Sequence, residues 1–234
     1  MSDRPLALVT GATRGIGAAV AHALADTHEL LLGGRDEDTL ARLARALPAA
    51  RPWIADLADA ESLGARVPDV DTLDVLVHSA GVGTIGPLPD TSVRVWRETL
   101  SVNVIAVAEL TRLLLPALRA ARGHVVLVNS GQGIRPSPGW GAYAASKFAL
   151  RAYADVLRAE EESSGVRVTT VFPGRTATDL QRRVRAAEGG QYRPADYLRP
   201  ESVADAVRFA VTAPADAQVP ELVIRPRPHS DPPG

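Results

Sequence analysis

Short apolar runs alternate with amphipathic stretches along almost the whole chain. The apolar runs are rich in Val, Ile and Leu, which is typical of parallel strands that are buried on both faces. Between them, apolar residues recur at helical spacing. This alternation predicts an α/β, doubly wound domain of about seven parallel strands with helices on both faces. The strands are expected at residues 6–10, 29–32, 51–55, 73–78, 124–129, 166–172 and 221–225.

The helices fill the gaps between these strands. One should follow the first strand at residues 18–25, and two long ones are expected at 93–121 and 141–164. Pro116 should kink or break the first long helix, because proline cannot donate a helical hydrogen bond. The sequence shows neither an internal repeat nor an interdomain linker, so residues 1–225 are expected to form one catalytic domain. Residues 226–234 are proline-rich and are expected to form a flexible tail.

Composition excludes several classes of function. The 26 basic and 27 acidic residues nearly cancel, so no broad field attracts nucleic acid or an anionic membrane. The chain has no cysteine, and no two of its five histidines have the spacing of metal ligands, so no metal site is expected. Neither a signal peptide nor an apolar run of membrane-spanning length is apparent. We therefore expect a soluble, cytoplasmic protein with a small-molecule substrate.

Glycines cluster where the first predicted strand meets the first predicted helix, in Thr10-Gly11-Ala12-Thr13-Arg14-Gly15-Ile16-Gly17. Glycines at such a junction permit a tight turn and let a pyrophosphate approach the backbone. The helix N-terminus offers free N–H groups and a favourable dipole. Many strand-to-helix turns carry glycine for steric reasons alone, but this one opens an alternating α/β pattern, which indicates dinucleotide binding.

The end of the second predicted strand indicates which dinucleotide is bound. A carboxylate there would bind a ribose 2′-hydroxyl, whereas an arginine accommodates a 2′-phosphate. Gly34 stands where the carboxylate is expected, Arg35 follows it, and Arg14 can approach from the glycine loop. The sequence thus favours NADP (as NADPH) over NAD as the cofactor of the domain at residues 1–225, unless both arginines are only solvated surface.

Lys147 is the only lysine in the chain, and it lies four residues after Tyr143. Residues four apart share a helix face, so the two side chains should meet. A cation about 5 Å from the phenol would lower the pKa of that phenol by about 2 units at an effective dielectric of about 20. Tyr143 is then a candidate general acid and base. Spacing alone would equally suit two residues that merely share a helix face.

The pattern Thr-Gly-x-x-x-Gly-x-Gly at residues 10–17, followed in order by Asn103, Ser130, Tyr143 and Lys147, resembles the short-chain dehydrogenase/reductase family, in its single-domain type with a Tyr-x-x-x-Lys motif. The resemblance extends from residue 6 to about residue 225 and implies a Rossmann-type domain.

The resemblance implies a role for each member of this group. Ser130 would bind the substrate carbonyl, and Tyr143 would protonate it. Lys147 would lower the pKa of Tyr143 and hold the nicotinamide ribose, and Asn103 would position a water for proton relay. The expected cofactor-binding residues are Gly11, Thr13, Arg14, Gly15, Ile16, Gly17, Arg35, Asp56, Leu57, Ala80, Gly81, Tyr143, Lys147, Pro173, Gly174, Thr176 and Thr178.

The family's usual Asn-Asn-Ala-Gly motif is His78-Ser79-Ala80-Gly81 here, which removes an amide that supports the sheet. Residues 179–198 are expected to cover the substrate. The expected apolar wall and its possible neighbours are Leu180, Val184, Tyr192, Tyr197, Gln132, Ile134, Trp140 and Ile85. Arg182, Arg183 and Arg185 would either meet an anionic substrate or simply face water. Mainly apolar walls suit a ketone or aldehyde of moderate size.

Three functions remain open at this stage. The first is an NADPH-dependent carbonyl reductase that also runs in reverse as an alcohol dehydrogenase. The second is a reductase of β-ketoacyl thioesters. The third is a non-catalytic protein that senses NADP(H), although such proteins usually lose the Tyr or the Lys. A homodimer or homotetramer is expected, with the two long helices as the dimer contact.

Overall fold

The computed structural model describes residues 4–214 and 216–227, and it contains one seven-stranded parallel sheet. Across the sheet the strands run in the order β3-β2-β1-β4-β5-β6-β7. Their bounds are Leu6–Thr10 (β1), Glu29–Gly34 (β2), Ala50–Ile54 (β3), Val75–His78 (β4), His124–Val128 (β5), Arg167–Pro173 (β6) and Glu221–Ile224 (β7). The predicted doubly wound fold is confirmed, and each predicted strand is present.

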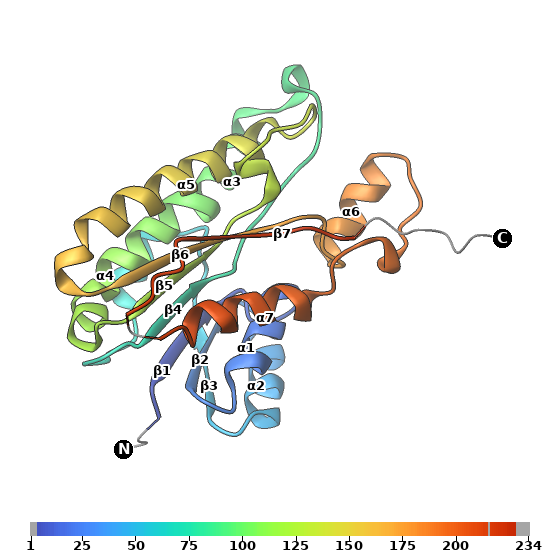
Figure 1. The fold of residues 1–234 in the computed structure, drawn as a ribbon. Coiled ribbons are helices and arrows are strands. Elements are labelled where there is room, and N and C mark those ends of the chain that lie inside the picture. The colour runs from blue at the N-terminus through green and yellow to red at the C-terminus, as the bar shows by residue number, and fades with distance from the viewer. Residues whose placement is uncertain (1–3, 215, 228–234) are drawn as a thin grey trace.

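Helices cover both faces of this sheet (Figure 1). On one face lie α1 (Gly15–Leu24), α2 (Glu37–Ala46) and α7 (Pro200–Val211), and on the other lie α3 (Val93–Leu100), α4 (Ala106–Ala121) and α5 (Gly141–Glu160). The helix α6 (Asp179–Ala187) stands apart, beyond the end of β7. Short 3₁₀ turns occupy Ala60–Ala65, Leu88–Asp90, Gly131–Gly133, Glu162–Ser164 and Pro194–Asp196.

Two apolar layers hold the helices to the sheet. Leu24 and Val207 are fully buried between the sheet and its α1–α7 face. Leu110 and Leu150 belong to the layer on the opposite face. Fully burying one such side chain contributes about 1.5–3 kcal/mol. The two layers therefore hold the helices firmly against the sheet and fix the positions of the strand ends.

The strand order places a crevice at the carboxyl ends of β1 and β4. The chain moves outward from β1 to β3 and then returns to place β4 on the other side of β1. The connections on the two sides of this point leave in opposite directions, which opens a gap above the strand ends. In doubly wound sheets ligands bind at this gap, so the topology alone locates the site.

The first long helix departs from its prediction in one respect. It continues through Pro116, so the expected break there is wrong. Pro116 and Arg112 are both exposed, and water can therefore bind the carbonyl that proline leaves without a partner. The irregularity lies earlier, at the π-helical turn Ser101–Ile105, where the amide of Ala106 donates to the carbonyl of Ser101.

Length and composition alone would let the continuous helix Val93–Ala121 cross a membrane, contrary to the expectation that no segment passes that test. Its most apolar part is 44% buried inside the structure, and α4 contributes Val107 and Leu114 to the layer against the sheet. These are properties of a core helix. Beyond β7, Pro226 and Arg227 are described, and the rest of the predicted 226–234 tail lies outside the described residues.

Candidate active site

A cavity of 270 Å³ lies over the carboxyl ends of β1, β2 and β4. It contains most of the residues predicted to bind the cofactor. Those are Gly11, Thr13, Arg14, Gly15, Ile16, Gly17, Arg35, Asp56, Leu57, Ala80, Gly81 and Thr178. Trp53 also lines this cavity and was missed by sequence reasoning, because nothing in a strand sequence tells which face will border a ligand.

The glycine loop is shaped for close approach of a ligand to the backbone. Gly11 has φ +68°, and a Cβ there would lie 2.9 Å from the backbone of Ala80. A Cβ on Gly17 would collide with the carbonyl oxygen of Gly11. No side chain in the described part of the chain caps α1, so its first N–H groups face the cavity without a side-chain acceptor. A pyrophosphate fits this cradle.

Thr10 fixes the spacing between β1 and β4 at the cavity. Its Oγ1 accepts hydrogen bonds from the amides of Ser79 and Ala80, at 3.1 and 3.2 Å, and donates to the carbonyl of Val77 at 3.3 Å. The Ser79 hydroxyl is buried at the cavity wall and has no partner among the described residues. A buried hydroxyl without a partner at a cavity wall is a ready contact for a polar ligand.

The far end of the cavity carries a guanidinium and lacks a free carboxylate at the β2 terminus. Asp36 caps α2 instead: its Oδ1 accepts from the Thr39 amide at 3.0 Å and its Oδ2 accepts from the Thr39 hydroxyl at 2.9 Å. Arg35 lines the cavity, with a side chain 73% exposed and 3.8 Å from Asp56. Arg14 lies 3.6 Å from Asp179. Both arginines remain accessible to an anionic group.

A second cavity, of 340 Å³, lies next to the first one. The two share Ile16, Thr178 and Leu180 in their walls. The predicted residues Ser130 and Tyr143 face the second cavity, and Pro173, Gly174 and Thr176 form its edge at the end of β6. A ligand can therefore extend from the glycine loop to the tyrosine.

Tyr143 is buried beside Ser130. Burial raises the pKa of the Tyr143 phenol, and a hydrogen bond with the Ser130 hydroxyl lowers it by a smaller amount. Ser130 in turn accepts from the Gln132 amide at 3.2 Å, at the start of a 3₁₀ turn that holds its side chain in place. The phenol therefore stays protonated at neutral pH.

Lys147 lies one helical turn after Tyr143 on α5 and is only 3% exposed. Its Nζ is 5.7 Å from the centroid of the Tyr143 ring and donates to the Val128 carbonyl at 3.1 Å. Burial lowers the pKa of this ammonium to about 8. The expected net lowering of the Tyr143 pKa is not found, because desolvation of the phenol is the largest cause and raises the pKa.

Asn103 occupies the π-helical turn and is also buried. Its Oδ1 accepts from the Val82 amide at 2.9 Å, and its Nδ2 donates to the Val82 carbonyl at 2.8 Å and to the Ser146 hydroxyl at 3.0 Å. The side chain thus joins the segment after β4 to α5. The predicted water-positioning role remains a prediction, while the amide of Asn103 clearly holds the framework around Tyr143 and Lys147.

His78 stands in the motif where the family usually has asparagine, and its imidazole makes a polar contact of its own. The His78 imidazole is buried, and its Nε2 lies 2.9 Å from the Thr111 hydroxyl of α4. That hydroxyl donates to the Val107 carbonyl at 2.7 Å. Burial lowers the pKa of His78 to about 3, so the ring is neutral and connects the sheet to α4.

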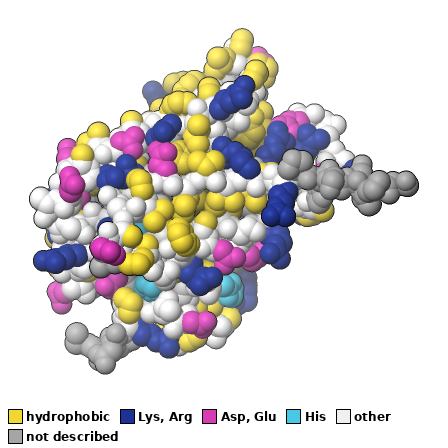
Figure 2. Space-filling model, in the orientation of Figure 1, with side chains coloured by type: hydrophobic (Ala, Val, Ile, Leu, Met, Phe, Trp, Pro, Cys, Tyr) yellow, Lys and Arg dark blue, Asp and Glu magenta, His cyan; other side chains and the backbone are white. Residues whose placement is uncertain are grey.

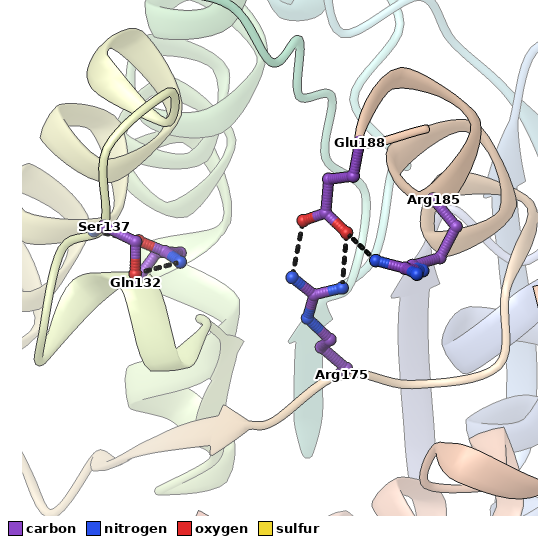
Figure 3. Close-up of polar contacts among 5 residues, drawn as sticks. All are labelled: Gln132, Ser137, Arg175, Arg185 and Glu188. Atoms are coloured by element: carbon purple, nitrogen blue, oxygen red, sulfur yellow. Dashed lines mark hydrogen bonds and ion pairs between the residues drawn. The ribbon is translucent and has the colours of Figure 1, made fainter. Parts of the chain in front are cut away.

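The segment after β6 encloses the second cavity from one side. Thr178 caps α6 by accepting from the Gln181 amide at 3.3 Å. Glu188, just after α6, binds the guanidinium of Arg175 through both carboxylate oxygens and that of Arg185 through one (Figure 3). On the opposite side in the same view, Gln132 accepts a hydrogen bond from the Ser137 amide. The ion pairs of Glu188 fasten α6 to the loop that follows β6.

The predicted substrate wall is only partly correct. Leu180, Val184, Gln132 and Trp140 line the second cavity, whereas Tyr192, Tyr197, Ile134 and Ile85 are not among its lining residues. None of the three arginines of α6 lines it either: Arg182 stacks over Tyr192 at 4.5 Å, Arg183 borders the first cavity, and Arg185 binds Glu188.

Three other arginines line the second cavity: Arg135, Arg175 and Arg225. The walls therefore carry positive charge in addition to the mainly apolar surface that was expected. These residues come from the loop after β5, the loop after β6 and the end of β7. No sequence signal links them, because only the parallel packing of β5, β6 and β7 brings their ends together.

The fold and the two adjacent cavities define a Rossmann-type dinucleotide-binding protein. The family model for short chain dehydrogenases matches residues 5–189. The chain belongs to the short-chain dehydrogenase/reductase family of oxidoreductases, as its motifs predicted.

Similar proteins include curated and solved members of this family. The chain is 36% identical to glycine betaine reductase ATRR of Emericella nidulans over 95% of its own length, which is 19% of that protein. It is 35% identical to mouse dehydrogenase/reductase SDR family member 7B over 79% of its length and 62% of that protein. The alcohol dehydrogenase of Thermococcus sibiricus complexed with 5-hydroxy-NADP superposes with a TM-score of 0.87, at 30% identity, covering 97% of this chain and 100% of that one.

Proposed function

We propose that this chain is an NADPH-dependent reductase that converts a ketone or aldehyde of moderate size into an alcohol, reversibly. The observation that carries the proposal is the placement of Tyr143 and Ser130 in a cavity that adjoins the glycine-loop cavity, with the Lys147 Nζ 5.7 Å from the Tyr143 ring. Bound NADPH would supply the hydride at this junction.

Each side chain then has a definite task. The substrate carbonyl oxygen would accept hydrogen bonds from Ser130 and Tyr143, and Tyr143 would pass its proton to that oxygen as negative charge develops there. Because burial raises the pKa of Tyr143, its phenol holds this proton at neutral pH, which suits reduction. Lys147, with a pKa of about 8, is mostly cationic at neutral pH and would stabilise the phenolate that proton transfer leaves.

The preference for NADP over NAD rests on the β2 terminus. Arg35 and Arg14 both border the cavity and are accessible. The nearest carboxylate after β2, that of Asp36, is engaged in capping α2. An arginine fork at this position suits a 2′-phosphate and offers nothing specific to a free 2′-hydroxyl. The complex of the similar alcohol dehydrogenase with an NADP derivative supports the same choice.

Two alternatives are weaker. A β-ketoacyl thioester reductase would need a basic entrance for the carrier phosphate. Arg182, Arg183 and Arg185, which prompted that idea, do not line the second cavity, so its support would have to come from Arg135 and Arg225 instead. A non-catalytic NADP(H)-sensing protein would not require both Tyr143 and Lys147 to be buried side by side.

The proposal also includes assembly and location. The long helices expose Ile105 and Phe148, at 52% and 41%, on the face predicted to form a homodimer. We propose such a dimer, and a cytoplasmic location. Analytical ultracentrifugation of the protein and of an Ile105→Glu variant tests the dimer. A shift of the variant to monomer supports it, and an unchanged oligomeric state contradicts it.

The direct test of function follows the loss of reduced-nicotinamide absorbance. Purified protein is offered NADPH or NADH with ketones, aldehydes, diketones and β-ketoacyl thioesters, and Tyr143→Phe serves as the control. Turnover with NADPH that disappears in the control supports a carbonyl reductase. Tight NADPH binding without turnover of any compound would instead favour the non-catalytic alternative.

A further inference from the structure

The walls of the second cavity carry an unbalanced charge. Three guanidinium groups, those of Arg135, Arg175 and Arg225, line it, and none of its lining residues is an aspartate or a glutamate. The whole chain has a net charge of −1, so this local excess does not follow from composition. In Figure 2, dark blue side chains lie on the right-hand side of the molecule, where Figure 1 places the end of β7 and α6.

Arg175 is neutralised by its surroundings, and the other two arginines are not. Glu188 binds Arg175 through both carboxylate oxygens. Arg225 bonds only backbone oxygens: its Nη1 donates to the Phe172 carbonyl at 3.1 Å and lies 3.4 Å from that of Ile224. Within the residues that the structure describes, neither Arg225 nor Arg135 forms an ion pair with a carboxylate. Two positive charges therefore remain available to a ligand.

The position of Arg225 relates it directly to the reacting carbonyl. A Cβ built on Gly131 would lie 3.4 Å from Nη1 and 3.5 Å from Nη2 of Arg225, so the guanidinium packs against Gly131. Gly131 follows Ser130, whose hydroxyl is hydrogen-bonded to Tyr143. The charge thus stands beside the strand end that presents the carbonyl-binding hydroxyl, and it is separate from Arg14 and Arg35 in the first cavity.

A buried amide adds a second, independent observation. Gln181 lines the same cavity and is only 6% exposed, yet its Nε2 has no hydrogen-bond partner within the described residues. Leaving such a donor unpaired in the protein interior is unfavourable. An acceptor on a ligand in the cavity would satisfy it, and an oxyanion offers several acceptors at once.

We infer that the substrate carries an oxyanion, a carboxylate or a phosphate ester, which Arg225 and Arg135 bind while its carbonyl faces Tyr143. This inference rests on the proposed function and adds the substrate class. Arginine forks match the geometry of both anions, so the shared chemistry is an oxyanion held apart from the reacting carbonyl. Arginines that merely face solvent would give no preference for an anionic substrate.

The test compares matched methyl ketones that differ only in the group at the other end of the chain. That group is a carboxylate, a phosphate ester, a methyl ester or a trimethylammonium, each over a series of chain lengths. kcat and KM are measured with NADPH for the wild type, Arg225→Gln, Arg225→Lys, Arg135→Gln and the double glutamine variant. Arg45→Gln removes an equal charge from the exposed side of α2, away from both cavities.

The wild type should prefer the carboxylate or the phosphate over the ester by about tenfold or more, mainly through KM, because a charge-assisted hydrogen bond is gained. Arg225→Gln should remove most of that preference, the double variant should abolish it, and Arg225→Lys should restore part of it. Arg45→Gln should retain the wild-type ratio. The better of the two anions identifies the group that the site takes.

Two outcomes overturn the inference while leaving the proposed function intact. One is ester turnover, lost in Tyr143→Phe, that equals or exceeds turnover of both anions. The other is an anion preference that Arg225→Gln and the double variant do not reduce.

Failure of every compound to turn over would count against the proposed function, and calorimetry would then decide the inference. The keto acid is titrated into protein saturated with NADP⁺. Binding that is lost in the double variant supports the oxyanion site. Absence of binding, or equal binding of the keto acid and its ester, contradicts it.

Discussion

Asn103 holds the backbone of Val82 at two points, with Oδ1 accepting from the amide at 2.9 Å and Nδ2 donating to the carbonyl at 2.8 Å. The same Nδ2 reaches Ser146 on α5, the helix that carries Tyr143 and Lys147. One buried amide therefore joins the π-helical turn, the segment after β4 and the helix of the proposed proton donor.

Replacing Asn103 with Ala should destabilise the protein by about 2–3 kcal/mol, because the Val82 amide and carbonyl both lose their partner. Ser146→Ala removes only the neighbouring hydroxyl and should cost less. Urea unfolding of both variants, alongside kcat and KM, measures the difference. Equal losses of stability in the two variants would show that the contact with Val82 is not the important one.

Arg35→Ala should raise the KM for NADPH by about tenfold to a hundredfold and change that for NADH little, because only NADPH carries the 2′-phosphate. Arg45→Ala, on the next helix, is the matched loss of a surface arginine. Steady-state kinetics with both cofactors gives the answer. Equal weakening of NADPH and NADH would mean that Arg35 does not contact the 2′-phosphate.

The stability of the protein should depend on pH through Lys147. Its pKa is about 8 when buried, against an ordinary value of 10.5. Between these values the unfolded chain binds more protons than the folded one, so the contribution of Lys147 to stability rises with pH across that window, by roughly 3 kcal/mol in all.

Lys147→Met should lack this rise. Unfolding free energies of the wild type and the variant, measured from pH 7 to pH 10, should show the wild type gaining on the variant above pH 8. Above pH 10 Tyr143 acts in the opposite direction in both proteins, because its folded pKa is raised. Parallel curves for the two proteins would show that Lys147 titrates normally in the folded state.

Acid should destabilise the protein through His78. Burial lowers its pKa from 6.5 to about 3, so the unfolded chain takes up a proton in this window that the folded chain refuses. Stability attributable to His78 is complete above pH 6.5 and is lost as the pH falls toward 3.

His78→Asn, which restores the residue that the family motif usually has here, should flatten the acid side of the stability curve by about 1.4 kcal/mol per pH unit. Unfolding at several pH values below 6.5 tests this. His22→Asn, at an exposed position of α1, is the control. A change in slope of the same size in that control would show that burial of His78 is not the cause.

Most of the fold follows from local sequence patterns. A buried parallel strand is a short run of β-branched and leucine residues between glycines or polar turns, and the central strands follow this pattern closely. The edge strand β3, with the sequence ARPWI, fits it less well but is also present. The glycine loop was also predictable from the sequence, because the backbone leaves no room for a side chain at Gly11 and Gly17.

Features that depend on tertiary contacts were not predictable. The π-helical turn at Ser101–Ile105 contains no helix-breaking residue that would reveal it in the sequence. It contains Asn103, which hydrogen-bonds Val82, twenty-one positions away in the chain. Pro116 was misread because its tolerance depends on the exposure of Arg112. Arg135 and Arg225 reach one cavity only after β5, β6 and β7 have paired.

The most direct test of the proposed chemistry compares Tyr143→Phe with Tyr153→Phe, two identical atomic deletions on α5. Tyr143 faces the second cavity, whereas Tyr153 hydrogen-bonds Thr111 on the far side. kcat for NADPH oxidation with an accepted carbonyl compound should fall by roughly a hundredfold or more in Tyr143→Phe, with NADPH binding retained, and stay near the wild-type value in Tyr153→Phe. Full turnover by Tyr143→Phe would contradict the assignment of Tyr143 as the proton donor.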